Sequence, residues 1–109
     1  MRYDVLTTPP FDRQLKRLVR KFPSLKAEYA ELVEELETNP EKGIPLGNNC
    51  FKIRLAVASK GRGKSGGARV ITHIYVENET VFLLAIYDKS EQDNISDKEL
   101  KVLLSEIEK

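Results

Sequence analysis

The first third of the chain changes from an alternating pattern of residues to a helical one. Residues 2–8 alternate between apolar and polar types and precede two prolines, which predicts a short edge strand. From Phe11 onward the apolar residues recur every three or four positions, so an amphipathic helix is predicted as far as Pro23. A second run with this spacing begins after Ser24, a candidate N-cap. The two runs predict a helical hairpin with one basic arm and one acidic arm.

The rest of the chain predicts a loop, three strands and a final helix. Residues 39–49 are rich in Pro, Gly and Asn and are predicted to be a loop. Three strand-like runs follow, at residues 50–57, 68–76 and 80–87. The short link between the second and third runs requires an antiparallel hairpin. Ser96 and Glu99 have the spacing of a capping box before a last amphipathic helix. The predicted fold class is α+β in the order β-α-α-β-β-β-α, with an antiparallel sheet, an N-terminal helical hairpin and a C-terminal helix in one domain, residues 1–109.

Strand periodicity assigns the side chains of these runs to two faces of the sheet. Successive residues point to opposite faces, so Phe51, Ile53 and Leu55 are expected under the helices. The same rule divides the last strand into two sets, which are Phe82, Leu84 and Ile86 on one face and Leu83, Ala85 and Tyr87 on the other. The face away from the helices is predicted to collect six residues: Lys52, Arg54, Arg69, His73, Tyr87 and Lys89.

Charge is segregated along a chain whose formal net charge is only +1. Residues 50–76 contain no acidic residue but carry these cations: Lys52, Arg54, Lys60, Arg62, Lys64 and Arg69. A sheet face with clustered cations and no carboxylates is suited to bind a polyanion such as a nucleic acid.

A glycine-rich basic loop, residues 58–67, joins the first two of the three strand-like runs. Its Gly-Lys-Ser tripeptide resembles the end of a phosphate-binding loop. The required first glycine is replaced by Ala58, however, and a strand follows where the motif needs a helix. We predict instead that Lys60, Arg62 and Lys64 contact RNA phosphates. An ordinary solvated loop is the alternative.

One cysteine and one histidine limit other kinds of chemistry. Cys50 alone excludes an internal disulfide, and together with His73 it supplies too few ligands for a structural zinc site. We therefore expect neither a metal nor a cofactor. The sequence shows no signal-peptide pattern and no apolar run long enough to span a membrane, which predicts a cytoplasmic protein that does not bind membranes.

The set of Lys52, Arg54 and Arg69 suits the cleavage of RNA without a metal. In that reaction the ribose 2'-hydroxyl attacks the adjacent phosphate, which requires cations near the dianionic phosphorane and a proton donor for the leaving oxygen. A lysine among arginines can serve in proton transfer and in charge stabilisation. The alternative is that these side chains are solvated or pair with the acids of a partner. His73 and Tyr87 are further candidates, and structural packing is the alternative for each.

These residues resemble the RelE/ParE superfamily of bacterial type II toxin–antitoxin toxins, and within it the RelE and HigB ribonuclease branch. The resemblance extends from FDRQLKRL to the last helix, and its most specific part is the succession of CFKIRL, ARVI and IYDKSE. It implies a small α+β toxin that cleaves messenger RNA in the translating ribosome. It also implies that neither metal nor cofactor takes part and that an antitoxin wraps the toxin and inhibits it.

The resemblance also implies roles for individual residues. Lys52 and Arg54 match two basic positions on the first central strand, where they stabilise charge or accept the 2'-hydroxyl proton. Arg69 matches an arginine that orients the scissile phosphate, and Lys89 stands where RelE proteins have a second arginine. RelE proteins have a tyrosine shortly before the final helix, and here that position is Ile95. Tyr87 or His73 substitutes for it, or charge stabilisation does most of the work, or catalysis is weak.

The resemblance implies several partners and leaves other functions open. The expected partners are a helix-turn-helix antitoxin, the ribosome and messenger RNA, with operator DNA bound only through the antitoxin. One alternative is a ParE-like protein that inhibits DNA gyrase by binding, because fold does not separate the two activities. The other alternative is an inactive, toxin-derived binding module, which the missing tyrosine at Ile95 leaves open.

Overall fold

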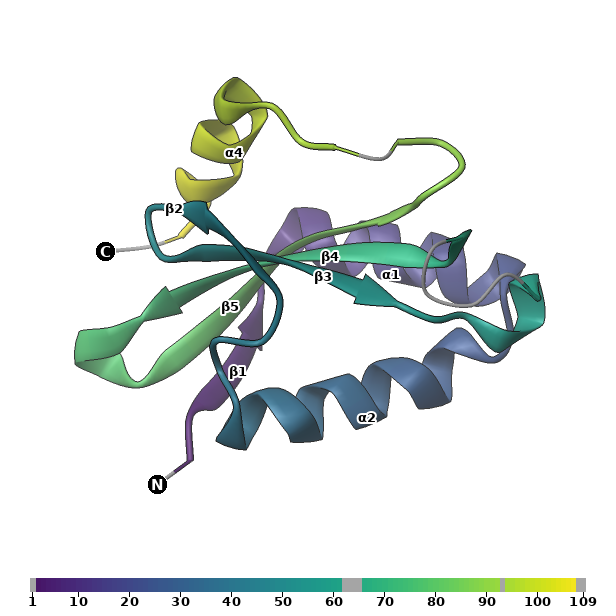
Figure 1. Cartoon of the computed structure of the whole chain (residues 1–109), viewed down its shortest axis with the longest axis horizontal. Helices are drawn as coiled ribbons and strands as arrows, with labels where there is room; N and C mark the ends of the chain where they lie inside the picture. The colour runs from purple at the N-terminus through teal and green to yellow at the C-terminus, as the bar shows by residue number, and fades with distance from the viewer. Residues whose placement is uncertain (1, 62–65, 93, 108–109) are drawn as a thin grey trace.

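The computed structural model describes residues 2–61, 66–92 and 94–107, which form a five-stranded sheet between two layers of helix (Figure 1). The helices and strands are β1 (Asp4–Thr7), α1 (Pro9–Lys21), α2 (Leu25–Thr38), β2 (Ile44–Gly47), β3 (Cys50–Leu55), β4 (Ala68–Tyr75), β5 (Thr80–Asp88) and α4 (Asp97–Leu104). Short 3-10 turns cover Ala58–Lys60 and Val76–Asn78. The sheet order is β1-β5-β4-β3-β2. The predicted α+β class, with a helical hairpin and a C-terminal helix, is confirmed.

The helices begin where the sequence provides caps. The Thr8 side chain accepts a bond from the Phe11 amide, and the two prolines that follow suit the first helical turn of α1. At α4, Ser96 and Glu99 form the predicted capping box in both directions. Ser24 precedes α2 as expected, but its hydroxyl bonds to Glu28 and Ser59 and does not cap the helix. It links α2 to the turn that follows β3.

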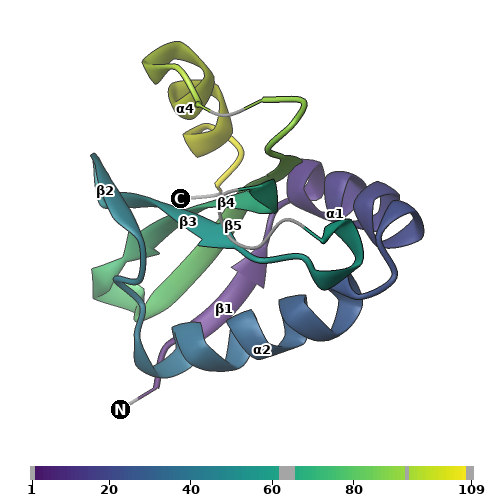
Figure 2. The same cartoon turned by 45° about the vertical axis from the view of Figure 1, so that its right-hand side comes forward.

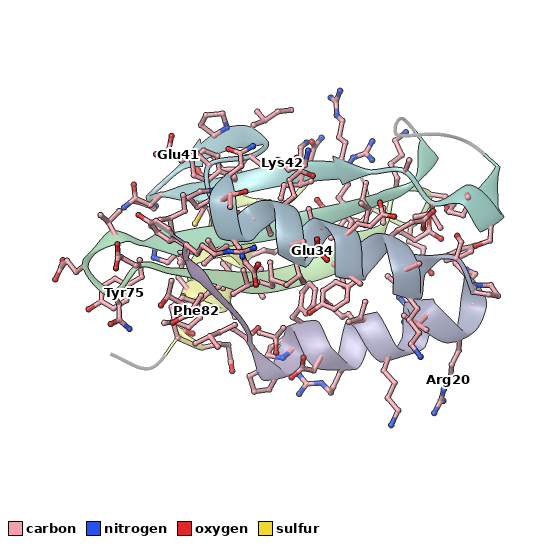
Figure 3. The ribbon with its side chains drawn as sticks, turned by 90° about the horizontal axis from the view of Figure 1, so that it is seen from below. Arg20, Glu34, Glu41, Lys42, Tyr75 and Phe82 are labelled. Atoms are coloured by element: carbon pink, nitrogen blue, oxygen red, sulfur yellow. The ribbon has the colours of Figure 1, made fainter. Side chains whose placement is uncertain are left out.

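The α1–α2 hairpin covers one face of the sheet, and α4 lies over the other (Figures 1 and 2). The larger core lies under the hairpin and includes Phe11, Leu32 and Val70. The smaller core lies under α4 and includes Ile71 and Leu100. Figure 3 shows the hairpin from its outer side, where Arg20 on α1 and Glu34 on α2 are exposed. No helix in the described ranges is long and apolar enough to span a membrane.

Strand β2 lies within the segment predicted to be a loop. Asn48 and Asn49 both have positive φ, as a tight two-residue hairpin requires, and they connect β2 to β3. Pro45 is tolerated because β2 is at the edge of the sheet. The sheet is also mixed, because β1 runs parallel to β5 while the other neighbours are antiparallel.

An extra residue in β5 changes the predicted division of its side chains. Ile71 pairs with Ala85, but the next residue, Thr72, pairs with Leu83, so Leu84 is a bulge. The two faces of β5 therefore carry Val81, Leu83 and Ile86 toward the hairpin and Phe82, Leu84, Ala85 and Tyr87 toward α4. Strict alternation was wrong for Phe82, Leu83 and Leu84, because the bulge reverses the phase of the strand.

Gly43 is the residue at which the backbone most clearly needs glycine. Its φ is +111°, and a Cβ there would lie 2.6 Å from the Lys52 carbonyl oxygen. Gly47 also has a positive φ, +90°, but a Cβ there would meet nothing within 4 Å. We expect Gly43→Ala to lose about 1 to 3 kcal/mol more stability than Gly47→Ala, because only the first adds a clash to the strained φ. Urea denaturation of both variants measures the difference, and equal losses would contradict the assigned clash.

Candidate active site

Three of the predicted site residues lie side by side across the three central strands. Arg54 on β3 pairs with Arg69 on β4, and Arg69 pairs with Tyr87 on β5. Directly opposed residues of neighbouring strands project from the same face of a sheet. We call Arg54, Arg69 and Tyr87 the cross-strand row. Lys52 lies two residues before Arg54, so it projects from the same face, toward α4.

The cations of this face differ in their exposure. Arg54 is exposed, whereas Arg69 is only 3% exposed and its Nη1 donates to the Ala68 carbonyl at 3.2 Å. Lys52 is half-buried, and its Nζ donates to Oδ1 of Asn94 at 3.1 Å. Asn94 belongs to the segment that crosses from β5 to α4 above the sheet (Figure 1). That segment and α4 lie over the face that holds Arg69.

Positive charge is concentrated at the row. Arg54 and Arg69 are directly opposed, an arrangement of like charges that destabilises a sheet. Within the described ranges, no carboxylate forms an ion pair with Arg54 or Lys52. Glu28, Glu31 and Glu35 of α2 line a hollow together with Arg54 but form no ion pair with it, so an anion can still bind to Arg54 and Lys52.

The remaining predicted cations lie in different surroundings. Lys89 is half-buried directly after β5, and its amide donates to the Gly67 carbonyl at 3.1 Å, which places its backbone at the same end of the sheet as the row. Arg62 and Lys64 lie outside the described residues.

Lys60 has an internal role that differs from the predicted RNA contact. Its Nζ forms an ion pair with Asp88, donates to the Gly67 carbonyl at 3.2 Å and lies 5.4 Å from the centre of the Phe22 ring. The side chain of Lys60 is only 8% exposed. Its charge is thus used to attach the start of the glycine-rich loop to the end of β5, and we leave Lys60 out of the RNA-contacting set.

Asp88 is the centre of this attachment. Its Oδ1 also accepts bonds from the amide and hydroxyl of Ser90, at 3.0 and 2.8 Å. Nζ of Lys21 lies 3.8 Å from Oδ2 of Asp88. Burial alone raises the pKa of the Asp88 carboxyl, but the bonds from Lys60 and Ser90 and the charge of Lys60 outweigh burial and lower the pKa from 3.8 to about 2. Asp88 directly follows Tyr87, but the contacts with Lys21 of α1 place this ion pair on the hairpin side of the sheet, opposite the face of the cross-strand row.

Cys50 and His73 are opposed at the other end of β3 and β4. Cys50 Sγ lies 3.5 Å from His73 Nδ1, and burial raises the pKa of the thiol to about 11. His73 is four residues from Arg69 on β4, or about 13 Å at the usual rise of a strand. The structure therefore places Tyr87, and not His73, beside Arg69. No group of three His, Cys, Asp or Glu residues in the described ranges is arranged to hold a metal ion.

Comparison with known families decides the classification. The model of the RelE toxin of the RelE/RelB toxin–antitoxin system matches residues 11–108. The chain belongs to the RelE toxin family. Among solved structures, it is similar to Escherichia coli toxin RelE in the free state, in a form with two arginine-to-alanine substitutions. That match has a TM-score of 0.62 at 15% identity and covers 97% of this chain and 94% of the other.

A second similar structure is the RelBE2 toxin–antitoxin complex of Mycobacterium tuberculosis. The TM-score is 0.60 at 24% identity, over 81% of this chain and 99% of that chain. At these identities the two likenesses establish the RelE fold alone.

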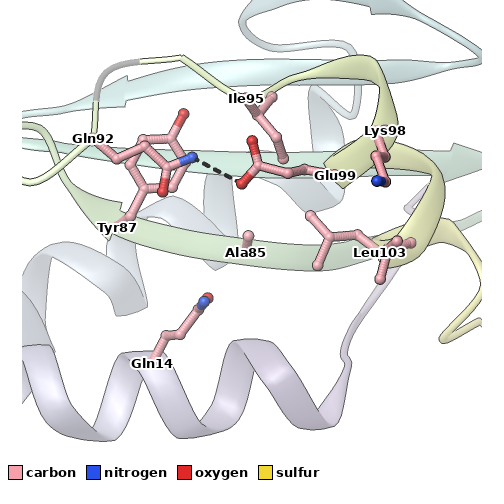
Figure 4. Close-up of a pocket in the computed structure, with 9 residues that line it drawn as sticks. Gln14, Ala85, Tyr87, Gln92, Ile95, Lys98, Glu99 and Leu103 are labelled. Carbon is pink, nitrogen blue, oxygen red and sulfur yellow. Dashed lines mark hydrogen bonds between the residues drawn. The ribbon is translucent and has the colours of Figure 1, made fainter.

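Ile95, which stands where RelE proteins are expected to have a tyrosine, belongs to the same apolar cluster as Tyr87. Both line a cleft of about 320 Å³ between β5 and α4 (Figure 4). The Tyr87 ring is thus next to the position at which the resemblance leads us to expect the family tyrosine. Sequence reasoning missed the polar residues of this cleft, which are Gln14, Gln92, Lys98 and Glu99. They come from α1, from the segment after β5 and from α4, and the local motif that includes Glu99, the capping box, indicates the start of a helix and not a cleft.

The Asp88–Lys60 pair gives a stability prediction. We expect Asp88→Asn to lose about 3 to 5 kcal/mol near neutral pH, because Lys60 is then buried without its partner. The lowered pKa of Asp88 stabilises the folded state above about pH 4. About 2 kcal/mol of that stability is lost as the pH falls toward about 2, so the difference between the two proteins shrinks there. Urea denaturation across this pH range measures the effect.

The exposed ion pair of Arg17 and Glu91 provides a matched control. Glu91→Gln should change stability by less than about 1 kcal/mol, because solvent screens that pair. If Asp88→Asn and Glu91→Gln lowered the free energy of unfolding equally, the buried Lys60–Asp88 pair would contribute no more to stability than an exposed pair.

Proposed function

We propose that this RelE-family protein is a ribosome-dependent messenger RNA endoribonuclease. The cross-strand row supports the proposal, because it joins two arginines and a tyrosine on one face with Lys52 beside them. Such a row supplies the cations that phosphate transesterification needs around the phosphorane, and it places a phenol beside them. Membership of the RelE toxin family supports the same activity.

Each residue has a distinct role in the proposed reaction. Arg69 holds the non-bridging oxygens of the scissile phosphate, since a guanidinium forms two parallel bonds to such a group. Arg54 and Lys52 stabilise the negative charge that develops when the 2'-hydroxyl attacks, and Lys52 or a ribosomal group receives its proton. Lys89 offsets charge near the 5'-oxygen that leaves. The leaving 5'-oxygen takes a proton from water or from a ribosomal group, so the products are a 2',3'-cyclic phosphate and a 5'-hydroxyl.

The burial of Arg69 gives a physical reason for dependence on the ribosome. At 3% exposure its guanidinium does not meet a phosphate in this conformation, so the side chains that cover it have to shift. Lys52 also has to give up its bond to Asn94 before its Nζ can act on the substrate. We propose that the ribosome-held messenger supplies the contacts that favour this opening, and that free RNA does so poorly.

An antitoxin is the proposed inhibitor of the protein. The RelBE2 structure is a toxin–antitoxin complex, and this chain shares its fold. We propose a helix-turn-helix antitoxin, through which alone the protein reaches operator DNA. The proposed place of action is the cytoplasm, where translating ribosomes are found.

Cleavage mapping with Arg69→Ala tests the activity. Wild-type protein added to translating ribosomes should break messenger RNA within codons, with EDTA having no effect when polyamines keep the ribosomes intact. Arg69→Ala should slow cleavage by about 100- to 1,000-fold, as loss of one oxyanion-type donor does. Lys26→Ala, which removes an exposed cation of α2, is the matched control and should cleave at the wild-type rate.

Two results would overturn the proposal. If Arg69→Ala cleaved at the wild-type rate, the cross-strand row would not be the catalytic site. Inhibition of DNA gyrase supercoiling without any RNA breaks would assign the protein to the ParE-like alternative.

Tyr87→Phe tests the contribution of the phenol. We expect cleavage within about threefold of wild type if the ring serves in stacking, because the phenyl ring keeps the π-face. A loss of more than about 100-fold would instead assign the hydroxyl to proton transfer. Single-turnover cleavage on ribosomes measures the rate, and Tyr87→Ala, which removes the ring itself, should be slow in either case.

A further inference from the structure

The cleft beside Tyr87 exists because β1 is shorter than β5. β1 pairs with β5 only from Asp4–Thr80 to Thr7–Leu83, so it does not extend along the second half of β5. Along that half, Gln14 of α1 occupies the place of a strand neighbour, and its Oε1 accepts a bond from the Ile86 amide at 3.1 Å. Ala85 projects toward α4 with only a methyl group, which leaves space under that helix. The result is the cleft of about 320 Å³ shown in Figure 4.

The cleft continues the cross-strand row. Tyr87 belongs to both, since it pairs with Arg69 and lines the cleft. The order across the sheet is therefore Arg54, Arg69, Tyr87 and then the cleft. In a nucleotide the base is separated from its phosphate by one sugar, so a phosphate held at Arg69 brings a flanking base to Tyr87 or just beyond it.

The lining of the cleft combines flat apolar surface with hydrogen-bonding groups. The apolar part comes from Ala85, Ile95, Val102 and Leu103. The polar part includes the carboxylate of Glu99, whose Oε1 accepts from the Ser96 amide and whose Oε2 lies 3.5 Å from Nε2 of Gln92. The bond from the Ser96 amide lowers the pKa of Glu99, which therefore remains ionised and only accepts hydrogen bonds at neutral pH.

Two oppositely charged residues of α4, Lys98 and Glu99, line the cleft. Glu99 supplies a hydrogen-bond acceptor, which favours a ligand that donates from an amine. A nucleobase with an exocyclic amino group has two apolar faces and such a donor on its edge. Uracil has no exocyclic amine and can donate to Glu99 only from its ring N3–H, between two carbonyl oxygens that the carboxylate repels.

We propose that this cleft binds the base that flanks the scissile phosphate, and that it prefers bases with an exocyclic amino group over uracil. The inference rests on the proposed ribonuclease function for its biological meaning. The base lies against Tyr87 and the apolar wall, and its amine donates to Glu99. The cleft thus selects the sequence at which the row cuts.

Binding of dinucleotides to the purified protein tests the cleft without a ribosome. The probes are ApA and UpU, each with a 2'-O-methyl group that prevents cleavage. We expect ApA to shift the NMR signals of Ala85, Val102 and Leu103, and UpU to bind about tenfold more weakly. Val102→Trp, at an exposed position of the cleft rim, fills the space and should abolish these shifts. Lys101→Trp adds the same ring on α4 outside the cleft lining and should retain them.

The possible results distinguish a failure of the base-binding inference from a failure of the proposed ribonuclease activity. Shifts confined to Arg54 and Arg69, equal binding of both probes, or ApA binding by Val102→Trp would each overturn the inference. It would also fail if ApA left the cleft signals unchanged while Val102→Trp lost binding to the antitoxin, which would assign the cleft to a protein side chain. ApA binding in the cleft by a protein that cuts no messenger RNA would overturn the proposed function and leave the base site standing. On ribosomes, Val102→Trp should change the bases at the cut sites while Lys101→Trp keeps them.

Discussion

The extra residue at Leu84 is the constraint on which both sides of the sheet depend. β5 is a central strand with apolar cores on both faces, and strict alternation would present Leu83 and Ile86 to different faces. The bulge lets both residues face the hairpin, while Leu84 and Ala85 both face α4. The same change of phase directs Tyr87 to the side of Arg69. One inserted residue therefore determines both how β5 packs in the two cores and that Tyr87 projects beside Arg69.

Charge is handled in two different ways at the end of β5. Lys60 and Asp88 are both almost fully buried, and they neutralise each other within a network that includes Ser90. One residue away, Arg54 and Arg69 face each other as like charges. The first arrangement stabilises the loop and strand ends that hold the second in place. The repulsion between Arg54 and Arg69 is tolerated because the Lys60–Asp88 pair stabilises the surrounding strand ends without any contribution from the two arginines.

Much of this structure follows from local sequence signals, and the rest depends on contacts that no local pattern contains. Helices α1 and α4 were predictable from apolar spacing and, at Ser96, from the capping box. Strand β2 was not, because Pro45 and its neighbouring glycines have the composition of a loop. The run around Leu84 is apolar throughout, so it carries no polar marker of the bulge. The cations Lys52, Arg54 and Arg69 were grouped correctly by strand parity, but nothing near Lys60 in the chain indicates that Asp88 is its partner.

The parallel pairing of β1 with β5 has a consequence for the order of folding. Asp4–Thr7 and Thr80–Leu83 are far apart in the sequence, so this contact closes a large loop that contains the two long helices and three of the other strands. Contacts of such long sequence separation form late and slow the folding of small domains. During synthesis β1 emerges first but stays without its sheet neighbour until β5 has left the exit tunnel. The row across β3, β4 and β5 is completed at the same stage, so a nascent chain acquires this face only after β5 has emerged.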